Sequence, residues 1–397
     1  MRHRRCKIGI TGKKEFILGY MNFPKGGNTS REKAVYQLKE FSCGTKIISG
    51  TGAVSALETM GAKRLLLVTD PYFVTNGTAQ RIAQAAKAQA VEIFHRVEPD
   101  PTVTLTAEGT ALVKEFSPDM IVALGGGSAM DCAKAMAYFS GLPVRLVAIP
   151  TTSGSGSEVT DFAILTHNSV KHPLVDPKLR PEAAILDDAL LQSLPSALIA
   201  DTGFDVLTHA LEAFVARDAS PITDALAKEA FCRVFADLPA SFGGLTQVRL
   251  GIHAASTMAG MAFTQAGLGL CHAMAHSLGG KFHLPHGRLN AILLPAVIQR
   301  NAHAAMDKYA RLARAAGLGG SADAIALRNL KNGLIRLRRE LHLPQTLAQA
   351  GVDPRQVWRE REALVTAALE DPCCATNPMP VEAFMVRDIL EEVTGHV

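Results

Sequence analysis

The spacing of hydrophobic positions changes near the middle of the chain. Between residues 41 and 190, short apolar runs such as residues 63–70 (KRLLLVTD) and 119–128 (DMIVALGGGS) alternate with helical patterns. Nearly continuous apolar strands of this kind are typical of a parallel sheet that helices cover on both faces. The pattern therefore predicts an α/β domain over residues 41–195.

Helical spacing dominates the rest of the chain. After about residue 200, apolar residues recur every three or four positions, as in residues 205–216 (DVLTHALEAFVA) and 224–238 (DALAKEAFCRVFADL). A chain of 397 residues also exceeds what one hydrophobic core usually supports. We therefore expect a second, all-α domain over residues 196–397.

Composition and charge describe an ordinary globular protein with a basic start. Hydrophobic residues make up 48% of the chain and charged residues 20%. No apolar run approaches the roughly 18 residues that cross a bilayer. Residues 1–40 hold ten basic and three acidic residues, whereas the remainder is slightly acidic. We therefore expect a soluble protein with no membrane and no nucleic-acid partner.

The basic leader, residues 1–40, has several interpretations. It lacks the continuous apolar stretch and the cleavage site of a secretory signal. A disordered tail, an amphipathic targeting segment and a true start at Met21 all stay open. The seven cysteines are scattered and form no C-x-x-C pair, which indicates reduced thiols in a cytoplasm-like compartment.

Two loops rich in glycine and hydroxyl residues follow predicted strands. Residues 125–128 (GGGS) lead from a strand into a helix, where backbone N–H groups and the helix dipole attract a phosphate. Residues 150–160 (PTTSGSGSEVT) form the second loop, and both loops should meet where parallel sheets bind ligands. A tight structural turn is the alternative for the first loop alone, because Met130 replaces the third glycine of the dinucleotide fingerprint.

Asp70 also ends a predicted strand. There its carboxylate can accept hydrogen bonds from an adenosine ribose and would repel a 2′-phosphate, which favours NAD over NADP. Asp70 precedes the glycine loop, the reverse of the usual order, so the nucleotide assignment depends on further evidence.

Four histidines gather between residues 267 and 287 (GLGLCHAMAHSLGGKFHLPHG). Upstream, Asp205 and His209 are four residues apart, which on a helix puts both on one face. With His272 and His286 they make one carboxylate and three imidazoles, a donor set that suits divalent Fe, Zn, Mn or Co. These four residues are the predicted metal ligands. The alternative is a set of buried histidines that each satisfy a hydrogen bond.

The other two histidines of that segment have different expected roles. His276 would lie one helical turn from a ligand, and its imidazole can relay protons near neutral pH. His283 is expected to line the pocket or to lie on the surface. Candidate walls for a small aliphatic substrate, with ordinary core packing as the alternative, are Phe263, Leu268, Met274 and Phe282.

Together these motifs resemble the iron-containing (group III) alcohol dehydrogenases. The matching segments run in family order over residues 41–395 and include GGGSAMDCAK, AIPTTSGSGSEVT, TGFDVLTHALEAF, AGLGLCHAMAHSLGG and LPHGRLNAILLP. Within the family, the chain looks most similar to the propanol dehydrogenases of bacterial microcompartments. The resemblance implies a dehydroquinate synthase-like architecture, in which a dinucleotide-binding α/β domain and an all-α metal-binding domain enclose a cleft.

The resemblance also implies cofactors and their contacts. Fe(II), with Zn(II) as the alternative, would bind Asp205, His209, His272 and His286, and His276 would be the catalytic residue beside the nicotinamide. NAD would contact Asp70, Asp100, Gly126, Gly127, Ser128, Thr151, Thr152, Thr160, Lys171 and His276. Arg288 and Leu289 depart from the usual family pattern after the Pro-His-Gly turn, but every ligand is intact.

The implied reaction is the NAD(H)-linked interconversion of short-chain primary alcohols and aldehydes by a homodimer or larger homo-oligomer. If residues 1–40 were an encapsulation tag, the enzyme would work inside a microcompartment of the cytoplasm, contact its shell or cargo, and run as an aldehyde reductase. A dehydroquinate synthase-like cyclase is one rival; it needs several basic side chains, yet residues 203–214 and 267–287 contain only Lys281. A non-catalytic scaffold is the other, and it requires an eroded site.

Overall fold

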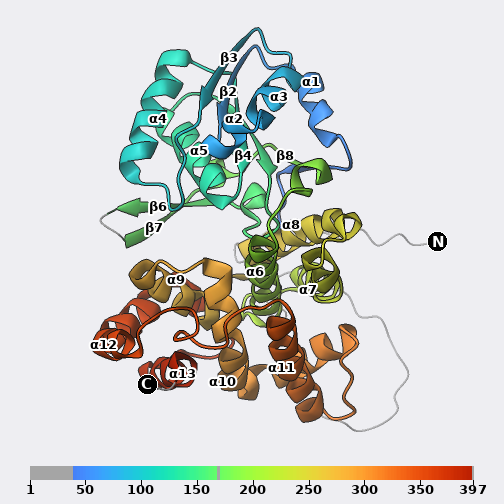
Figure 1. Cartoon of the computed structure of the whole chain (residues 1–397), viewed down its shortest axis with the longest axis vertical. Helices are drawn as coiled ribbons and strands as arrows, with labels where there is room; N and C mark the ends of the chain where they lie inside the picture. Colours follow the sequence, from blue (N-terminus) through green and yellow to red (C-terminus); the bar gives the residue numbers. More distant parts are fainter. Residues whose placement is uncertain (1–38, 168–169, 396–397) are drawn as a thin grey trace, which may run out of the picture. The chain divides into compact units, whose positions relative to one another are not determined.

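The computed structural model describes residues 39–167 and 170–395 of the chain. Within these residues, six parallel strands form a sheet in the order β1-β8-β5-β4-β2-β3 (Figure 1). The strands are β1 Lys46–Ser49, β2 Arg64–Val68, β3 Ala90–Phe94, β4 Met120–Gly125, β5 Arg145–Pro150 and β8 Ala183–Leu186. The predicted α/β fold with a parallel sheet is therefore confirmed.

Alternate residues of the central strands reach two separate cores. Leu65 and Leu67 of β2 pack into a cluster on one face of the sheet, whereas Leu66 and Val68 pack into a cluster on the other face. Successive side chains of a strand point to opposite faces of the sheet. A strand that is buried on both faces must therefore be apolar throughout. This explains the uninterrupted apolar runs of the sequence.

Helices cover both faces of this sheet (Figure 1). They are α1 Ala56–Met60, α2 Pro71–Thr75, α3 Thr78–Ala85, α4 Val103–Phe116 and α5 Gly127–Ser140. Leu57 of α1 and Ile82 of α3 belong to the first core, and Val113 of α4 and Met136 of α5 belong to the second. Beside the sheet, β6 Phe162–His167 and β7 Val170–Val175 form an antiparallel pair.

The second half of the chain is helical, as predicted. Its helices are α6 Ser196–Val215, α7 Pro221–Phe242, α8 Arg249–Ala266, α9 Leu270–Phe282, α10 His286–Ala315, α11 Asp323–Glu340, α12 Pro354–Glu370 and α13 Ala383–Thr394. One core of buried side chains runs through them. The helix α6 is buried at every position from Gly203 to Val215, and α7, α8 and α10 pack around it. The predicted domain boundary at residue 195 lies between the end of β8 and the start of α6.

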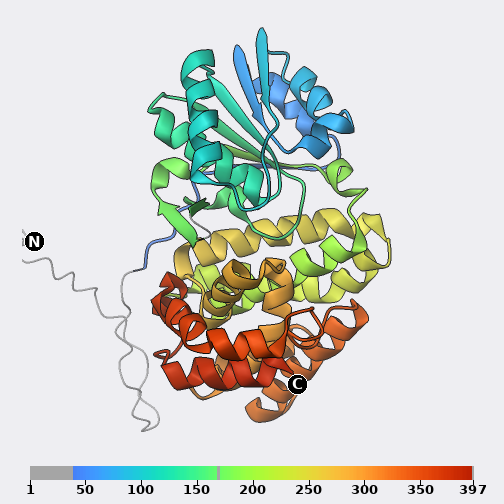
Figure 2. The same cartoon turned by 60° about the vertical axis from the view of Figure 1, so that its left-hand side comes forward.

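Short 3-10 helices complete the described elements. They are η1 Ala53–Ser55, η2 Ser157–Val159, η3 Pro177–Leu179, η4 Asp188–Leu191, η5 Thr246–Val248 and η6 Pro372–Thr376. The loop that contains η2 packs against α8, drawn in yellow in Figure 2. Ser153 Oγ lies 2.9 Å from His253 Nδ1, and the Thr257 hydroxyl donates to the Glu158 carboxylate at 2.6 Å. All four side chains are buried, so these hydrogen bonds hold the second glycine loop against the helical half.

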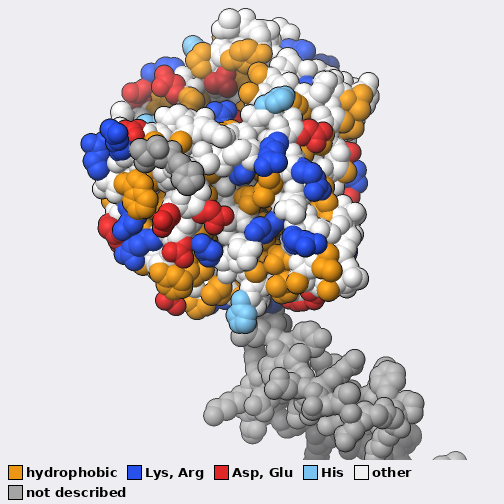
Figure 3. Space-filling model, turned by 60° about the horizontal axis from the view of Figure 1, so that its bottom comes forward, with side chains coloured by type: hydrophobic (Ala, Val, Ile, Leu, Met, Phe, Trp, Pro, Cys, Tyr) orange, Lys and Arg blue, Asp and Glu red, His pale blue; other side chains and the backbone are white. Residues whose placement is uncertain are grey.

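The described residues include no helix with the length and apolar character that a membrane span requires. On the face shown in Figure 3, basic, acidic and hydrophobic side chains are interspersed. The predicted leader, residues 1–40, lies outside the described residues except for Lys39 and Glu40.

Candidate active site

Three helices bring the predicted metal ligands together. Asp205 and His209 lie one turn apart on the buried helix α6. His272 lies in the first turn of α9, and His286 is the first residue of α10. Residues that are 81 positions apart in the chain therefore face one point, because α9 and α10 both pack against α6.

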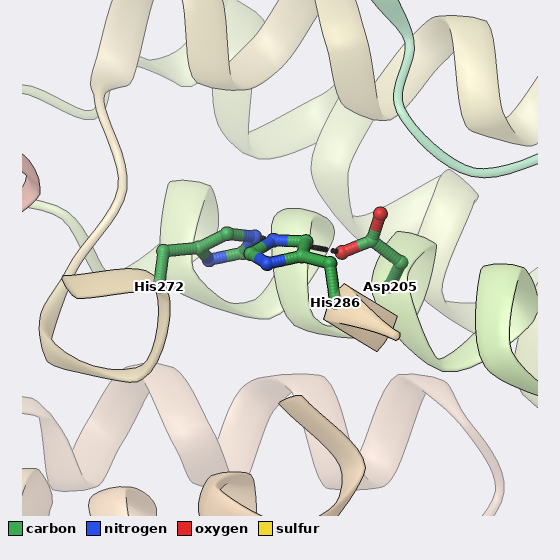
Figure 4. A group of neighbouring side chains, drawn as sticks. All are labelled: Asp205, His272 and His286. Carbon is green, nitrogen blue, oxygen red and sulfur yellow. Dashed lines mark ion pairs between the residues drawn. The ribbon is translucent and has the colours of Figure 1, made fainter. Parts of the chain in front are cut away.

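The distances between the donor atoms fit a single ion. Asp205 Oδ1 lies 3.5 Å from His286 Nε2, 3.7 Å from His272 Nε2 and 3.9 Å from His209 Nε2. Figure 4 shows three of these side chains pointing toward one another. Ligands bound at about 2.1 Å in a tetrahedron stand roughly 3.4 Å apart. The donor atoms of Asp205, His272 and His286 all lie within 4.8 Å of one another, which leaves room for one divalent cation. His209 is outside this group of three and approaches it through Asp205 Oδ1. The residues present thus fit the metal that the sequence predicts.

Burial and neighbouring charges shift the pKa values of these four side chains in different directions. Burial lowers the pKa of His209 to about 4 and that of His286 well below its usual value, so both are neutral at pH 7. Burial also acts to lower the pKa of His272, but hydrogen bonds and charges from Asp205 and Glu212 raise it to about 9. For Asp205, burial acts to raise the pKa, but the surrounding histidines lower it by more. The net effect is a pKa well below the usual value, so the carboxylate stays ionised. A cation must therefore displace one proton, from His272.

Two side chains that sequence reasoning missed surround the donors. Asn290 is fully buried and donates from Nδ2 to Asp205 Oδ1 at 2.8 Å. The same Nδ2 lies 3.3 Å from His272 Nε2 and 3.2 Å from His286 Nε2. Glu212 Oε2 accepts the hydrogen bond of His272 Nδ1 at 2.6 Å. Both residues therefore orient side chains that would face a bound ion.

His276 and an aspartate from a distant segment form a second polar pair. His276 Nδ1 donates to Asp371 Oδ2 at 2.8 Å, and the His276 ring stacks on that of His286 with centroids 5.1 Å apart. Burial raises the pKa of Asp371, but the hydrogen bonds from His276 and from Cys373 hold it at about 2. No local pattern in the sequence points to Asp371, because 95 residues separate it from His276.

Cys373 lies close enough to this pair to suggest a third donor. One donor atom each from His276, Asp371 and Cys373 lie within 4.8 Å of one another. Burial raises the pKa of the Cys373 thiol well above its usual value, and its backbone N–H donates to Asp371. A protonated thiol is a poor metal ligand. We therefore interpret the group as a hydrogen-bonded pair of His276 and Asp371, in which the Asp371 carboxylate also accepts from the backbone N–H of Cys373.

The two predicted nucleotide loops lie side by side. The first turn, Gly126 to Ser128, joins β4 to the start of α5, and Thr151 directly follows β5. The Thr151 N–H donates to the Gly125 carbonyl at 3.0 Å. Both loops therefore stand at the carboxyl edge of the sheet, where the N-terminus of α5 supplies free N–H groups for a phosphate.

Asp70 lies beside the glycine turn. It caps α2, accepting from the N–H groups of Tyr72 and Phe73. Its second oxygen, Oδ2, lies 3.8 Å from the position that a Cβ on Gly125 would take. Burial raises the pKa of Asp70. The next residue, Pro71, borders an open surface pocket of about 570 Å³, which is also lined by Arg96, Asp100, Thr102 and Glu108.

The remaining predicted cofactor contacts have partners within the protein. Lys171 Nζ and Asp100 Oδ1 form an ion pair at 2.6 Å, so these two predicted contacts face each other. Thr160 is fully buried, and its hydroxyl lies 2.8 Å from Lys134 Nζ. Thr152, by contrast, is half-buried next to Thr151.

Of the residues predicted to line the substrate pocket, one lies beside the predicted metal donors and the others belong to the hydrophobic core or pack against it. Phe263 stacks on the His209 ring with centroids 4.4 Å apart, so it borders the metal donors. Met274 belongs to the buried core, and Leu268 and Phe282 pack against that core from partly buried positions. His283 is exposed, which settles its placement on the surface. Arg288, the departure from the family pattern, forms a two-pronged ion pair with Asp201 of α6.

Comparisons with known proteins identify the family of the chain. Residues 44–188 match the iron-containing alcohol dehydrogenases, and residues 199–394 match the C-terminal part of the Fe-containing alcohol dehydrogenase family. Together the two matches cover most of the chain, and the chain therefore belongs to the iron-containing alcohol dehydrogenase family.

Individual relatives cover nearly the whole chain. The 1-propanol dehydrogenase PduQ of Citrobacter freundii is 42% identical, over 90% of this chain and all of that protein. The crystal structure of a 1,3-propanediol oxidoreductase superposes with a TM-score of 0.84 at 32% identity, over 90% of this chain and all of the other. A sulfoacetaldehyde reductase from Bifidobacterium kashiwanohense, solved with NAD⁺, gives a TM-score of 0.81 at 27% identity, over 90% of this chain and 99% of the other. The predicted family and its propanol dehydrogenase-like character are therefore confirmed.

Proposed function

We propose that this alcohol dehydrogenase interconverts short-chain primary alcohols and aldehydes, such as propanol and propanal or ethanol and acetaldehyde, with NAD(H) and a divalent metal. The observation that carries the proposal is the spacing of 3.5 to 3.9 Å between Asp205 Oδ1 and three histidine Nε2 atoms. The 42% identity to a protein named as a 1-propanol dehydrogenase supports the substrate class.

Asp205, His209, His272 and His286 would hold the metal, with Fe(II) as the first candidate and Zn(II) as the second. When bound, the metal supplies a Lewis acid for the substrate oxygen, and the nicotinamide supplies the hydride acceptor or donor. The aromatic ring of Phe263 limits the space beside His209. This placement favours a small substrate.

Asp70, the glycine turn and the threonine loop would bind the dinucleotide. Asp70 keeps one oxygen for the ribose, because its other oxygen already accepts two backbone N–H groups. A carboxylate at that position repels the extra phosphate of NADP. We therefore assign NAD(H) as the preferred cofactor. Lys171 and Asp100 stand at the edge of the same region and are assigned to cofactor contacts that replace their ion pair.

His276 is assigned to proton transfer. Asp371 accepts the Nδ1 proton of His276, so the Nε2 atom is the one that exchanges protons with the substrate oxygen or with water. The stacked ring of His286 keeps the imidazole in place beside the metal donors.

We also propose an oligomeric state and a location in the cell for this protein. The protein would act as a homodimer or larger homo-oligomer in the cytoplasm, and residues 1–40 would direct it into a bacterial microcompartment. Fusing residues 1–40 to a fluorescent reporter tests the last point, since diffuse fluorescence in microcompartment-forming cells contradicts it. Light scattering on purified protein tests the oligomer.

The central experiment measures the reaction itself. Protein reconstituted anaerobically with Fe(II) or Zn(II) is mixed with NADH and propanal, and the absorbance at 340 nm is followed. The matched control is Asp205→Asn, which keeps the shape of the side chain and removes its charge from the donor set. Metal-dependent loss of absorbance in the wild type and not in the variant supports the proposal. An inactive wild-type protein that carries a full complement of metal contradicts it.

A further inference from the structure

Glu212 is a buried carboxylate that belongs to no ligand set. It is 3% exposed and lies on α6, three residues after His209 and seven after Asp205. All three side chains therefore form one polar stripe on a helix that is otherwise surrounded by apolar core. A buried carboxylate is unfavourable unless hydrogen bonds and charge compensate for its burial, so the partners of Glu212 indicate its role.

Those partners lie at the start of α9. Glu212 Oε2 accepts from the Gly269 N–H at 3.0 Å, and Oε1 accepts from the Cys271 N–H at 2.7 Å. The first N–H groups of a helix have no partner within the helix, and the helix dipole there attracts a negative charge. The approach is close, because a Cβ on Gly269 would lie 2.8 Å from Glu212 Oε1. Glu212 therefore fixes the first turn of α9 against α6.

The third partner is the side chain of His272, the predicted metal donor on that turn. His272 Nδ1 donates to Glu212 Oε2 at 2.6 Å, a short charge-assisted hydrogen bond. Once a cation has displaced the proton on Nε2, the hydrogen bond to Glu212 keeps the remaining proton on Nδ1, and the lone pair of His272 is then on Nε2, the atom that lies 3.7 Å from Asp205 Oδ1. One carboxylate thus fixes both the ring orientation and the tautomer that coordination requires.

We propose that Glu212 is a positioning residue of the metal centre. By holding His272 with its Nε2 toward Asp205, Glu212 sets the affinity of the site for the divalent cation. The proposal rests on the metal centre of the proposed function. It separates two roles of Glu212, the orientation of His272 and the anchoring of α9, which different substitutions can test.

Asn377 supplies the matched control. Its side-chain Oδ1 accepts from the Leu270 N–H at 3.2 Å, so it also anchors the first turn of α9. It is buried, like Glu212, and its other hydrogen bonds go to Asn301 and to the Met379 carbonyl. Substitution of Asn377 therefore loosens the same turn and leaves the hydrogen bond on His272 Nδ1 intact.

The test compares wild type, Glu212→Gln and Asn377→Ala after complete removal of metal. Zn²⁺ affinity is measured by competition with a chromophoric chelator, the visible spectrum of the Co²⁺ form reports the coordination geometry, and the melting temperature of the metal-free protein reports the fold. We expect Glu212→Gln to weaken Zn²⁺ binding about 10- to 100-fold and to change the Co²⁺ spectrum. Asn377→Ala should lower the melting temperature and keep the affinity within about threefold and the spectrum unchanged.

Other results contradict the proposal in distinguishable ways. Wild-type affinity in Glu212→Gln, or an equal loss of affinity in Asn377→Ala, overturns the role of Glu212 and leaves the metal centre standing. A wild-type protein that binds neither Zn²⁺ nor Co²⁺ overturns the proposed function itself. If Glu212→Gln does not fold, Glu212→Asp replaces it, because the shorter side chain keeps the charge but withdraws it from His272. A loss of affinity in Glu212→Asp supports the proposal, and wild-type affinity overturns it.

Discussion

Replacing Gly287 with alanine tests how strictly the metal donors depend on the packing of α10 against α6. Gly287 directly follows His286 in the first turn of α10. A Cβ at this position would lie 2.6 Å from the carbonyl carbon of Asp201 and 3.2 Å from the Cβ of Asp205. Non-bonded carbon atoms prefer about 3.5 to 4.0 Å, so the two helices must separate by about 1 Å.

That shift is large for a metal site. The obstructing atoms are backbone, which cannot rotate away as a side chain can, and His286 must move with its neighbour. Metal–ligand distances tolerate only about 0.2 Å, so we expect Zn²⁺ affinity to fall at least about tenfold. Overpacking of this kind also costs about 1 to 3 kcal/mol of stability, which should lower the melting temperature of the metal-free protein.

The assay is chelator competition for Zn²⁺, with Gly279→Ala on α9 as the control. There the new Cβ would meet Leu289 Cδ1 at 3.4 Å, an ordinary contact, so affinity should stay close to that of the wild type. Wild-type affinity in Gly287→Ala would show that the start of α10 adapts freely, and the argument from donor spacing would fail.

Three further experiments test the release of a proton from His272, proton transfer by His276 and the preference for NADH over NADPH. The pKa of His272, about 9, lies above its usual value, so a metal ion and a proton compete for this side chain. Metal binding should therefore release about one proton at pH 7 and about half a proton near pH 9. Calorimetry in buffers of different ionisation enthalpy measures the number of protons released, and release of none at pH 7 contradicts the prediction. Asp371→Asn should lower kcat roughly 100-fold at unchanged metal content, because His276 loses its carboxylate partner; an unchanged kcat would remove His276 from proton transfer. Asp70→Ser keeps a capping oxygen for α2 and removes the charge, so the NADPH-to-NADH ratio of kcat/KM should rise roughly tenfold or more, and an unchanged ratio argues against a ribose contact.

The parts of the fold that the sequence predicted share a physical origin. Strands buried on both faces need uninterrupted apolar residues, and helices packed on a core need apolar residues every three or four positions, so both patterns are visible locally. The metal donors were visible for a similar reason, because Asp205 and His209 lie one helical turn apart. His286 is the central residue of a Pro-His-Gly sequence, which is also a local signal.

Residues that act through tertiary contacts were less visible. Asp371 meets His276 across 95 positions, and Asn290 reaches Asp205 from another helix, so no spacing connects them. The ion pair between Lys171 and Asp100 likewise depends on how β7 approaches the loop before α4. Glu212 is different, because it follows Asp205 and His209 at helical spacing. An acidic residue on a stripe of predicted ligands was a usable signal.

This stripe also explains why α6 tolerates charge in its most buried part. A helix surrounded by core on all sides would ordinarily be apolar all round, since each unpaired polar group there costs free energy. On α6, Asp205 is compensated by Asn290 and the histidines, and Glu212 is compensated by the start of α9. The polar groups therefore tie α6 to α9 and α10, the same helices that present His272 and His286. The packing of these helices and the position of the predicted metal donors consequently depend on the same contacts, so we expect a change that separates the helices to displace the donors as well as to loosen the core.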